Sequence, residues 1–383
     1  MVAHHTEWKE CIFKDTGIEV LKGQIITRDK AKEGEFPVVA GGKEPAYHCD
    51  KYNRDGFTVT ISASGANAGY VNLYKGKIFA SDCSTISEAP NYDIRYIYYL
   101  LLNKQSEIYD AQTGGAQPHI HPKDIYKIPI IFTSDISEQQ AIASTLSDFD
   151  EHIDNLTKLI EKKKAIRDGA LEDLVSGKTR LDGFDGEWEE KCINDFIKIQ
   201  RGASPRPIEY YLTNGANGVN WIKIGDAPRY GKYIETTEER ITQSGANHSV
   251  MVYPDDFILS NSMSFGRPYI LKVKGCIHDG WLRLYDFQEN ADRDFLFYLL
   301  SSQNVQSQYA EAAAGSGVQN LNKEVVKGVK VVLPSVPEQQ AIAQVLIAMD
   351  EEIESLEAEK SKVIQIREGA MDDLLTGRVR LKI

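Results

Sequence analysis

The chain has 383 residues, 42% of them hydrophobic and 26% charged, with a formal net charge of −12. This composition is typical of a globular protein with two or three domains. The chain has no apolar run long enough to span a membrane, and its N-terminus lacks the apolar stretch of a signal peptide. Five scattered cysteines, an odd number without CxxC spacing, predict free thiols and a cytoplasmic location.

The negative charge has an uneven distribution that matters for the choice of partner. Nucleic-acid binding depends on Lys and Arg, so a net charge of −12 argues against it at first sight. About half of the acidic excess lies in two repeated segments, residues 137–181 and 337–383. A local basic patch elsewhere remains compatible with the composition, and the total charge leaves DNA binding open.

Residues 1–136 predict an α+β domain. Alternating and β-branched runs, GFTVTISASG and YVNLYKGKIFA, predict strands near its middle. A helical run follows over 95–112, and then a glycine-rich loop, TGGAQPHI. A short apolar strand, IYKIPIIF, leads into the first repeated segment.

Residues 137–181 predict a long helix, and residues 337–383 predict a near copy of it. Both copies begin EQQAIA, both end with GxxRL, and nearly half of their aligned residues are identical. Asp135 and Ser335 are predicted N-caps, each followed three residues later by the Glu of a capping box. Gly177 and Gly377 occupy the C-cap position.

Within both helices the apolar residues repeat with the 4-3-4-3 spacing of a heptad seam. These residues are Ile142, Leu146, Phe149, Ile153, Leu156 and Ile160, then Ile342, Leu346, Met349, Ile353 and Leu356. We therefore expect the two copies to pair as an antiparallel coiled coil; the alternative is that each helix packs only on its own domain. Gly169 and Gly369, unfavourable inside helices, suggest the close approach of another backbone. At positions 160 and 163 the first copy has Ile and Lys where the second has Lys360 and Val363.

A short linker, residues 182–187, precedes a second α+β domain at 188–336. The domain openings are similar, EWKECI and EWEEKCI, and the order of predicted elements repeats. Strand-like runs DDFILSNSMSFG and YILKVKGCIHDGWLRLYDF precede a helical run at 294–314 and the loop GSGVQNL. The second domain is about 20 residues longer, and the extra residues are expected upstream of Phe257, in TNGANGVNWIKIGDAPRYGKY.

The chain lacks the usual catalytic motifs. It has no phosphate-binding GxxxxGK[ST], no G-x-S-x-G, no HExxH and no Asn-Pro-Pro-aromatic tetrapeptide. His119 and His121 are a close pair, but no Cys or acidic residue stands at a ligand spacing, so a polar loop is the favoured interpretation over a metal site. These absences favour a binding protein over an enzyme.

The predicted loops are rich in the groups that contact DNA. Arg suits guanine and Asn or Gln suits adenine, whereas Lys, Ser and backbone N–H groups suit phosphates. For any one of these loops taken alone, ordinary turn residues are the favoured interpretation. The candidate DNA contacts are Lys51, Arg54, Asn67, Gln117 and His119 in the first domain and Ser204, Arg206, Lys223, Arg229, Lys232, Asn261, Ser264, Arg267, Gln319 and Asn320 in the second.

Two unlike domains, each followed by a near copy of one helix that begins EQQAIA, resemble the specificity subunit of type I restriction–modification systems. The resemblance covers the whole chain and implies a fold of two target-recognition domains linked by an antiparallel coiled coil. It implies that each domain reads one half of a bipartite, asymmetric site in double-stranded DNA. It further implies two copies of a methyltransferase subunit, which would hold S-adenosylmethionine, and a restriction and translocase subunit.

By the same resemblance, the specificity subunit is non-catalytic, holds no cofactor of its own, and docks its partners at the ends of the helices. The predicted partner contacts are Gln139, Gln140, Gln339 and Gln340. Two alternatives remain: a two-headed protein-binding scaffold, favoured slightly by the net charge, and a stand-alone nuclease or methyltransferase, for which no motif exists.

Overall fold

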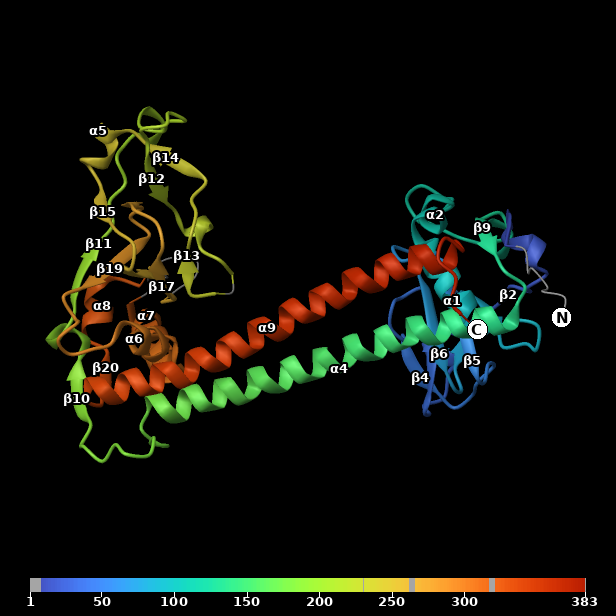
Figure 1. Cartoon of the computed structure of the whole chain (residues 1–383), viewed down its shortest axis with the longest axis horizontal. Helices are drawn as coiled ribbons and strands as arrows, with labels where there is room; N and C mark the ends of the chain where they lie inside the picture. The colour runs from blue at the N-terminus through green and yellow to red at the C-terminus, as the bar shows by residue number, and fades with distance from the viewer. Residues whose placement is uncertain (1–7, 230, 262–265, 317–320, 383) are drawn as a thin grey trace. The chain divides into compact units, whose positions relative to one another are not determined.

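The computed structural model describes residues 8–229, 231–261, 266–316 and 321–382. It divides into two compact units, one formed by Met1–Leu159 with Leu356–Ile383 and the other by Ile160–Ser355. Two helices of 40 residues, α4 (Ile136–Val175) and α9 (Val336–Leu375), each begin in one unit and continue into the other (Figure 1). Each unit therefore contains one α+β domain, the start of one long helix and the end of the other.

The first domain contains three small sheets and three short helices. Its elements are β1 (Lys9–Ile12), η1 (Phe13–Thr16), β2 (Leu21–Lys22), η2 (Arg28–Lys30), β3 (Phe36–Val39), β4 (Tyr47–Cys49), β5 (Phe57–Ser62), β6 (Val71–Lys75), β7 (Phe79–Ala80), β8 (Cys83–Ser87), α1 (Ile94–Asn103), α2 (Gln105–Asp110), α3 (Pro122–Ile125) and β9 (Pro129–Phe132). The strand orders are β2-β8-β5-β6, β4-β3-β7 and β1-β9. Only β3 and β7 run parallel; the other neighbouring pairs of this domain are antiparallel.

The second domain repeats this plan with additions. Its elements are β10 (Glu189–Cys192), η3 (Ile193–Asp195), β11 (Lys198–Arg201), η4 (Ile208–Tyr210), β12 (Val219–Ile222), η5 (Ile224–Asp226), β13 (Tyr233–Ile234), β14 (Glu239–Ile241), α5 (Gln243–Ala246), β15 (Val250–Val252), β16 (Phe257–Ser260), β17 (Pro268–Leu271), β18 (Gly275–Ile277), β19 (Trp281–Tyr285), α6 (Arg293–Ser301), α7 (Gln303–Ser316), α8 (Lys323–Lys327) and β20 (Lys330–Leu333). The strand orders are β11-β19-β16-β17-β13, β14-β12-β18-β15 and β10-β20.

The two strand orders show where the second domain gained its extra length. The order β2-β8-β5-β6 corresponds to β11-β19-β16-β17, and the parallel pair of β3 and β7 corresponds to that of β12 and β18. The elements η5, β13, α5 and β15 lie between β12 and β16, upstream of Phe257 as the sequence predicts. The edge strand β13 pairs in parallel with β17 and has no counterpart in the first domain.

Each hydrophobic core joins a sheet to a helix and to both long helices. In the first unit the core contains Val59 and Ile61 of β5, Ile97 of α1, Ile142 and Leu146 of α4, and Leu374 of α9. In the second unit the core contains Phe257, Leu259, Leu299, Leu174 of α4, and Ile342 and Leu346 of α9. Burying one such side chain stabilises the fold by about 1.5–3 kcal/mol. Each core is thus complete only with the end of the helix that follows the other domain.

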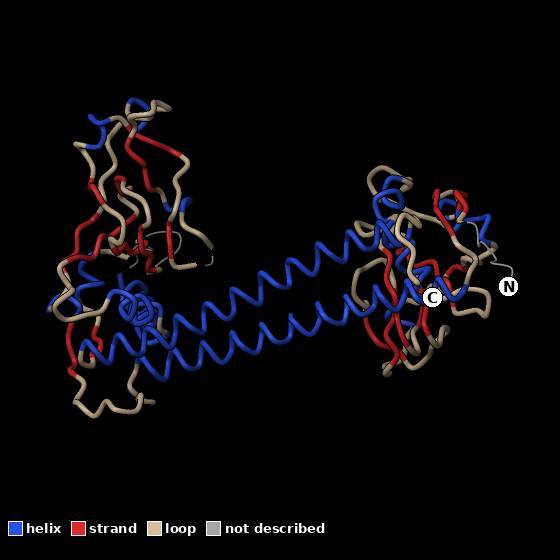
Figure 2. Tube along the Cα trace, viewed as in Figure 1, coloured by secondary structure: helices blue, strands red, loops and turns tan. Residues whose placement is uncertain are grey.

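The long helices lie side by side (Figure 2), and the ion pairs between them show that they run antiparallel within each unit, as the sequence predicts. In the first unit Arg367 Nε lies 2.7 Å from Asp150 Oδ1, and in the second unit Arg167 Nε lies 3.2 Å from Asp350 Oδ1. Because Asp150 and Asp350 are equivalent residues of the repeat, as are the two arginines, each unit contains the same ion pair with the helices exchanged. The alternative in which each helix packs only on its own domain is wrong.

The helix ends differ in part from the prediction. Asp135 caps α4, since its carboxylate accepts hydrogen bonds from the N–H groups of Ser137 and Glu138. The Glu138 side chain, however, accepts from Thr133 Oγ1 and forms an ion pair with Arg380, so it does not complete a capping box. The charged partner, Arg380, follows the end of α9, and the buried carboxylate bonds to it instead of to the local backbone.

The glycines of the repeat have two different roles. Gly177 and Gly377 adopt left-handed φ values of 72° and 69°, as expected of C-caps. A Cβ on Gly377 would lie 2.7 Å from the ring of Trp8, so the C-terminal segment packs against the start of the first domain. The close approach predicted at Gly169 and Gly369 is wrong, because a Cβ on either would meet nothing within 4 Å.

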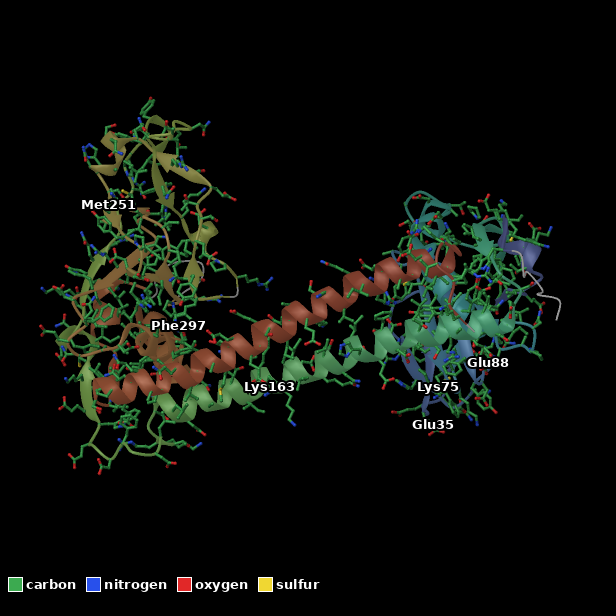
Figure 3. All side chains as sticks on the ribbon, viewed as in Figure 1. Glu35, Lys75, Glu88, Lys163, Met251 and Phe297 are labelled. Atoms are coloured by element: carbon green, nitrogen blue, oxygen red, sulfur yellow. The ribbon has the colours of Figure 1, made fainter. Side chains whose placement is uncertain are left out.

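The departure from the repeat at positions 160 and 163 has a partial explanation. Lys163, labelled on α4 in Figure 3, lies with its Nζ 2.6 Å from Glu352 Oε1 of α9. Ile160 is buried, with 6% of its surface exposed. The first copy therefore contributes an interhelical ion pair in the second unit at a position where the second copy has the half-buried Val363.

Candidate nucleic-acid interface

In the second domain, several loops converge on Asp279, in the turn between β18 and β19. Its carboxylate accepts from Ser204 Oγ at 2.8 Å and from Arg206 at 3.0 Å, and it lies 3.0 Å from His278 Nε2. Its carbonyl oxygen accepts from Arg201 Nε and from Asn261 Nδ2, both at 3.0 Å. The cluster thus gathers Ser204, Arg206 and Asn261, three predicted DNA contacts from two segments that are distant in sequence.

The electrostatics of this cluster keep Asp279 ionised. Partial burial raises the pKa of its carboxyl group, but the Ser204 hydroxyl, the neighbouring His278 and the Arg206 guanidinium outweigh burial and hold the pKa below its usual range. The side chain of Arg206 is 77% exposed, although it touches Asp279. An anion therefore orders the loop while the arginine stays open to solvent.

The first domain has an equivalent loop cluster around Asp82, in the turn between β7 and β8. The Ser64 hydroxyl donates to the Asp82 carboxylate, and the Ala63 N–H donates to the Asp82 carbonyl at 3.1 Å. The glycine-rich loop joins this segment, since the Ile120 N–H donates to the Ala63 carbonyl at 2.9 Å. In the second domain Leu321 donates in the same way to Asn261 at 2.8 Å, so both clusters have one backbone plan.

The glycine-rich loop of the first domain presents two predicted contacts. Thr113 and His119 pair across it, and Gln117 is exposed at its tip. A Cβ on Gly114 would lie 2.8 Å from the Gln117 carbonyl, and its φ of 92° favours glycine. The rings of His119 and His121 are stacked 6.3 Å apart. Within the described parts of the chain, no group of three or more His, Cys, Asp or Glu residues could hold a metal ion.

Close approach of a glycine fixes one further loop of each cluster. A Cβ on Gly23 would lie 2.1 Å from the Ser81 carbonyl oxygen, and one on Gly202 would lie 2.2 Å from that of His278. Both positions follow the strand at the edge of the sheet, β2 or β11. The loop that begins there is therefore held against the Asp82 or the Asp279 turn by a contact that only glycine permits.

The other predicted contacts of the first domain differ in exposure. Lys51 is exposed and Asn67 is half-buried. Arg54 donates to Thr85 Oγ1 at 3.0 Å and to the Asn53 carbonyl at 2.7 Å, so its guanidinium is occupied within the domain. Of the two cations, Lys51 is the more exposed to solvent, and its contact with DNA stays a prediction.

The predicted contacts in the extra segment of the second domain are bound to neighbouring residues. Lys223 Nζ lies 2.9 Å from Glu239 Oε1, and Lys232 forms an ion pair with Asp294. Arg267 donates to the carbonyl of Arg229, whose own side chain is exposed. Three further candidates, Ser264, Gln319 and Asn320, lie outside the described residues.

Two of the four predicted partner contacts are wrong. Gln139 and Gln339 are fully buried, with 0% of their surface exposed. Each accepts a backbone N–H at 2.8 Å, from Asp93 or Asp292, at the start of α1 or α6. They tie the long helices to the domains, because a buried amide must satisfy its hydrogen bonds internally. Gln140 and Gln340 are exposed and stay available to a partner.

Sequence reasoning missed a second group of residues in the first domain. Lys77 Nζ lies 4.5 Å from the ring centroid of Tyr52, which is 46% exposed, and Tyr52 lies edge-on to Phe36 at 5.2 Å. Elsewhere in the domain a hollow of about 640 Å³ is lined by residues that include Arg28, Tyr47 and His48. Aromatic and basic residues scattered over 28–77 gave no local motif. The aspartates Asp82 and Asp279 were also missed, although each is the second residue after an apolar strand.

The comparisons with known proteins agree with this architecture. The family model of the type I restriction modification DNA specificity domain matches residues 7–165 and 185–365. These matches cover most of the chain, which therefore belongs to that family. The family explains the two-fold repeat of domain and helix, because each match spans one domain and most of the helix that follows it.

Similar proteins cover nearly the whole chain. The type I restriction enzyme MjaVIII specificity subunit of Methanocaldococcus jannaschii is 26% identical, over 97% of each chain. The putative type I restriction enzyme MjaX specificity subunit of the same organism is 28% identical, over 83% of this chain and 77% of that relative. The solved S subunit of a type I restriction–modification system from M. genitalium has the same fold, with a TM-score of 0.64 at 22% identity over 98% of each chain. The predicted role, a DNA specificity subunit with two domains, is confirmed.

No helix within the described ranges is long and apolar enough to cross a membrane.

Proposed function

We propose that each domain reads one half of a bipartite DNA site through its loop cluster, and that the chain itself catalyses no reaction. The observation that carries this proposal is the shared backbone plan of the two clusters, built around Asp82 and Asp279 with different side chains. The first offers Gln117 and Lys51, and the second offers Arg206 and the exposed Arg229. A shared backbone arrangement that carries different side chains in the two domains suits a DNA site whose two halves differ in sequence.

The partners follow from the equivalence of the helix ends. Glu138 pairs with Arg380 in the first unit, and Glu338 pairs with Arg180 in the second at 2.7 Å. We infer that two copies of a methyltransferase subunit dock at these equivalent ends, near the exposed Gln140 and Gln340. S-adenosylmethionine would then belong to those subunits, and a restriction and translocase subunit would join the complex. The complex would work in the cytoplasm, where the DNA is.

The test is co-expression with a candidate methyltransferase subunit, followed by sequencing for methylated adenines. We expect one motif with two different halves separated by a fixed gap. Methylation at a short continuous palindrome, or no methylated motif at all, would refute the proposal. Exchange of the second domain for that of a relative should change one half of the motif and leave the other intact.

A further inference from the structure

The extra segment of the second domain, residues 223–229 with 231–232 (Tyr230 lies outside the described residues), is held in place at both of its ends. At its start, Lys223 donates its N–H to Asp226 Oδ2 at 2.6 Å, and its ammonium pairs with Glu239. At its end, Lys232 accepts a backbone hydrogen bond from Ile270 of β17 at 2.9 Å and pairs through its side chain with Asp294 of α6. The first domain has no counterpart to this segment.

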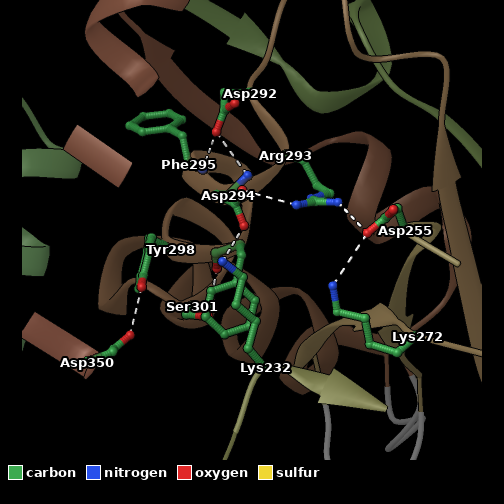
Figure 4. A network of polar contacts seen from close by, with 11 residues as sticks. Lys232, Asp255, Lys272, Asp292, Arg293, Asp294, Phe295, Tyr298, Ser301 and Asp350 are labelled. Carbon is green, nitrogen blue, oxygen red and sulfur yellow. Dashed lines mark hydrogen bonds and ion pairs between the residues drawn. The ribbon is translucent and has the colours of Figure 1, made fainter. Parts of the chain in front are cut away.

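The side chain of Lys232 is unsuited to contact DNA. Only 12% of it is exposed, and its ammonium lies 5.0 Å from the ring centroid of Phe297. The ring centroid of Tyr298 lies 5.3 Å from the same ammonium; Figure 4 shows Lys232 beside Tyr298. A phosphate contact needs an ammonium open to solvent, which this one is not. Desolvated cations on aromatic faces are held by the ring quadrupole as well as by the carboxylate. The residue therefore joins β13 to α6.

The charge of Lys232 is balanced within the protein. Burial raises the pKa of Asp294, but the ion pairs with Lys232 and Arg293 outweigh burial and hold it below its usual range. Arg293 also lies 2.6 Å from Asp255, which lies 3.7 Å from Lys272 (Figure 4). An ionised network thus links the edge strand, the turn before β16 and the start of α6.

The same helix is fixed to the long helices. The Tyr298 hydroxyl donates to Asp350 Oδ2 of α9 at 2.7 Å, and Asp350 pairs with Arg167 of α4. The end of the segment is therefore anchored, through α6, to the most regular part of the second unit. Rigid support of this kind is what a reading loop needs for selectivity.

The middle of the segment is hydrogen-bonded to Arg267 and to Tyr269 of β17. Arg267 donates to the carbonyl of Arg229, and the Tyr269 hydroxyl donates to that of Pro228 at 3.4 Å. The Ser260 N–H donates to the Arg267 carbonyl at 3.0 Å, one residue before the predicted contact Asn261. The exposed Arg229 is thereby held close to the end of β16.

We propose that Lys232 is a positioning residue, which fastens segment 223–232 to Asp294 so that Arg229 is presented to the second half-site. The inference rests on the proposed function and narrows it. The sequence favours Lys232 as a DNA contact, whereas its burial and partners assign it a role inside the protein. The two roles predict opposite effects of removing Asp294.

The test uses the full chain in complex with its methyltransferase subunit and a DNA duplex library randomised over the binding window. Bound duplexes are sequenced, and the base preference of each half-site is measured together with the salt dependence of binding. The variants are Lys232→Met, which keeps the apolar stem; Asp294→Ala; and the charge exchange Lys232→Asp with Asp294→Lys. Arg95→Ala is the matched control, because Arg95 pairs with Asp93 at the start of α1 in the first domain.

For a positioning role, Lys232→Met and Asp294→Ala should both reduce base preference at the second half-site by about fivefold or more, the discrimination that one base contact provides. The first half-site and the salt slope should not change. The charge exchange should restore the preference, and Arg95→Ala should leave the second half-site unaltered.

The proposal is overturned if Asp294→Ala leaves the second half-site unchanged or tightens binding while Lys232→Met lowers the salt slope by about 0.9, the value for one lost phosphate contact. If Lys232→Met does not fold, the charge exchange decides: a folded exchange variant without second half-site preference also overturns it. A wild-type complex that selects no bipartite sequence would instead refute the proposed function itself.

Discussion

Three cations of the second domain are bound differently from two lysines of the first, although both domains contain ion pairs and cation–ring contacts. In the second domain, Arg206, Lys223 and Lys232 pair with acidic residues of the same domain. In the first domain, Lys43 lies 5.2 Å from the ring centroid of Tyr70, and Lys77 lies 4.5 Å from that of Tyr52. Ion pairs order a loop but neutralise its charge, whereas a lysine over an aromatic ring keeps its charge for phosphate. The first domain should therefore contribute more of the salt-dependent affinity for DNA, and the second more of the rigid base reading.

The largest effect should come from a feature that the two units share. Arg180→Ala leaves the Glu338 carboxylate, 2% exposed, without its cation, and the free energy of unfolding should fall by about 3–5 kcal/mol. Arg380→Ala should cost somewhat less, because Arg380 is more exposed and Glu138 also accepts from Thr133. Urea denaturation measures both. Lys178→Ala, at an exposed pair with Asp173, is the control and should leave the free energy of unfolding nearly unchanged. Equal losses at all three residues would contradict this assignment.

Substitutions at the adjacent Gln139 and Gln140 should have separate effects, one on stability and the other on partner binding. Gln139→Ala leaves the Asp93 N–H and the Thr133 carbonyl without their partner, and should destabilise the first unit by about 1–3 kcal/mol. Gln140→Ala should change stability by less than about 0.5 kcal/mol but weaken capture of the methyltransferase subunit. Thermal melts and a pull-down test the pair. A normal pull-down with Gln140→Ala would remove this residue from the docking surface.

In the first domain, Arg54 and Lys51 should differ in their effects on stability and on the salt dependence of DNA binding. Arg54→Ala should lower stability by about 1–2 kcal/mol through its lost hydrogen bonds, with little change in the salt slope of DNA binding. Lys51→Ala should leave stability unchanged and reduce the slope by about 0.9. Binding of the complex to its cognate duplex at several salt concentrations tests this. The reverse pattern would assign the phosphate contact to Arg54.

The smallest effect concerns acid stability of the second domain. Because the pKa of Asp279 is lowered by folding, its stabilising contribution is full above the ordinary Asp pKa of about 3.9 and is lost as the pH falls through the lower folded-state value. Asp279→Asn should therefore lower the urea midpoint at about pH 6, and the difference from wild type should shrink steadily as the pH falls below about 3.9. Its side chain is 27% exposed, so the effect should stay below about 1 kcal/mol. A difference that persists at low pH would rule out a charge effect.

Local patterns in the sequence carried the prediction a long way. The repeat, the heptad spacing and the C-cap glycines predicted two antiparallel helices and two α+β domains, because helix signals lie within a few residues of one another. The resemblance to the specificity subunits rested on the same segments. The helical run at 95–112 is nevertheless two helices, α1 and α2, which meet at Lys104, where the backbone leaves the helical conformation.

The candidate site was predicted only as a set of residue types. Arg206 and Asn261 lie in separate segments, and neither local sequence indicates that both reach Asp279. Gln139 and Gln140 are adjacent and identical, yet one is buried and the other exposed. Lys232 and Lys51 both belong to loops with basic residues. Lys232 is nonetheless buried against aromatic rings and paired with Asp294, whereas Lys51 is exposed. Long-range contacts decide such differences, and a local pattern contains no record of them.

The sequence by itself determined the number of domains, the nature of the linking helices and the family, since each depends on periodicity or on repeated local motifs. The tertiary structure decided that each domain core is completed by the end of the other domain's helix, as the packing of Trp8 on Gly377 shows. It also decided which polar side chains face solvent and which are fastened inside. The physical reason is that burial and ion pairing depend on neighbours that only the folded chain brings together.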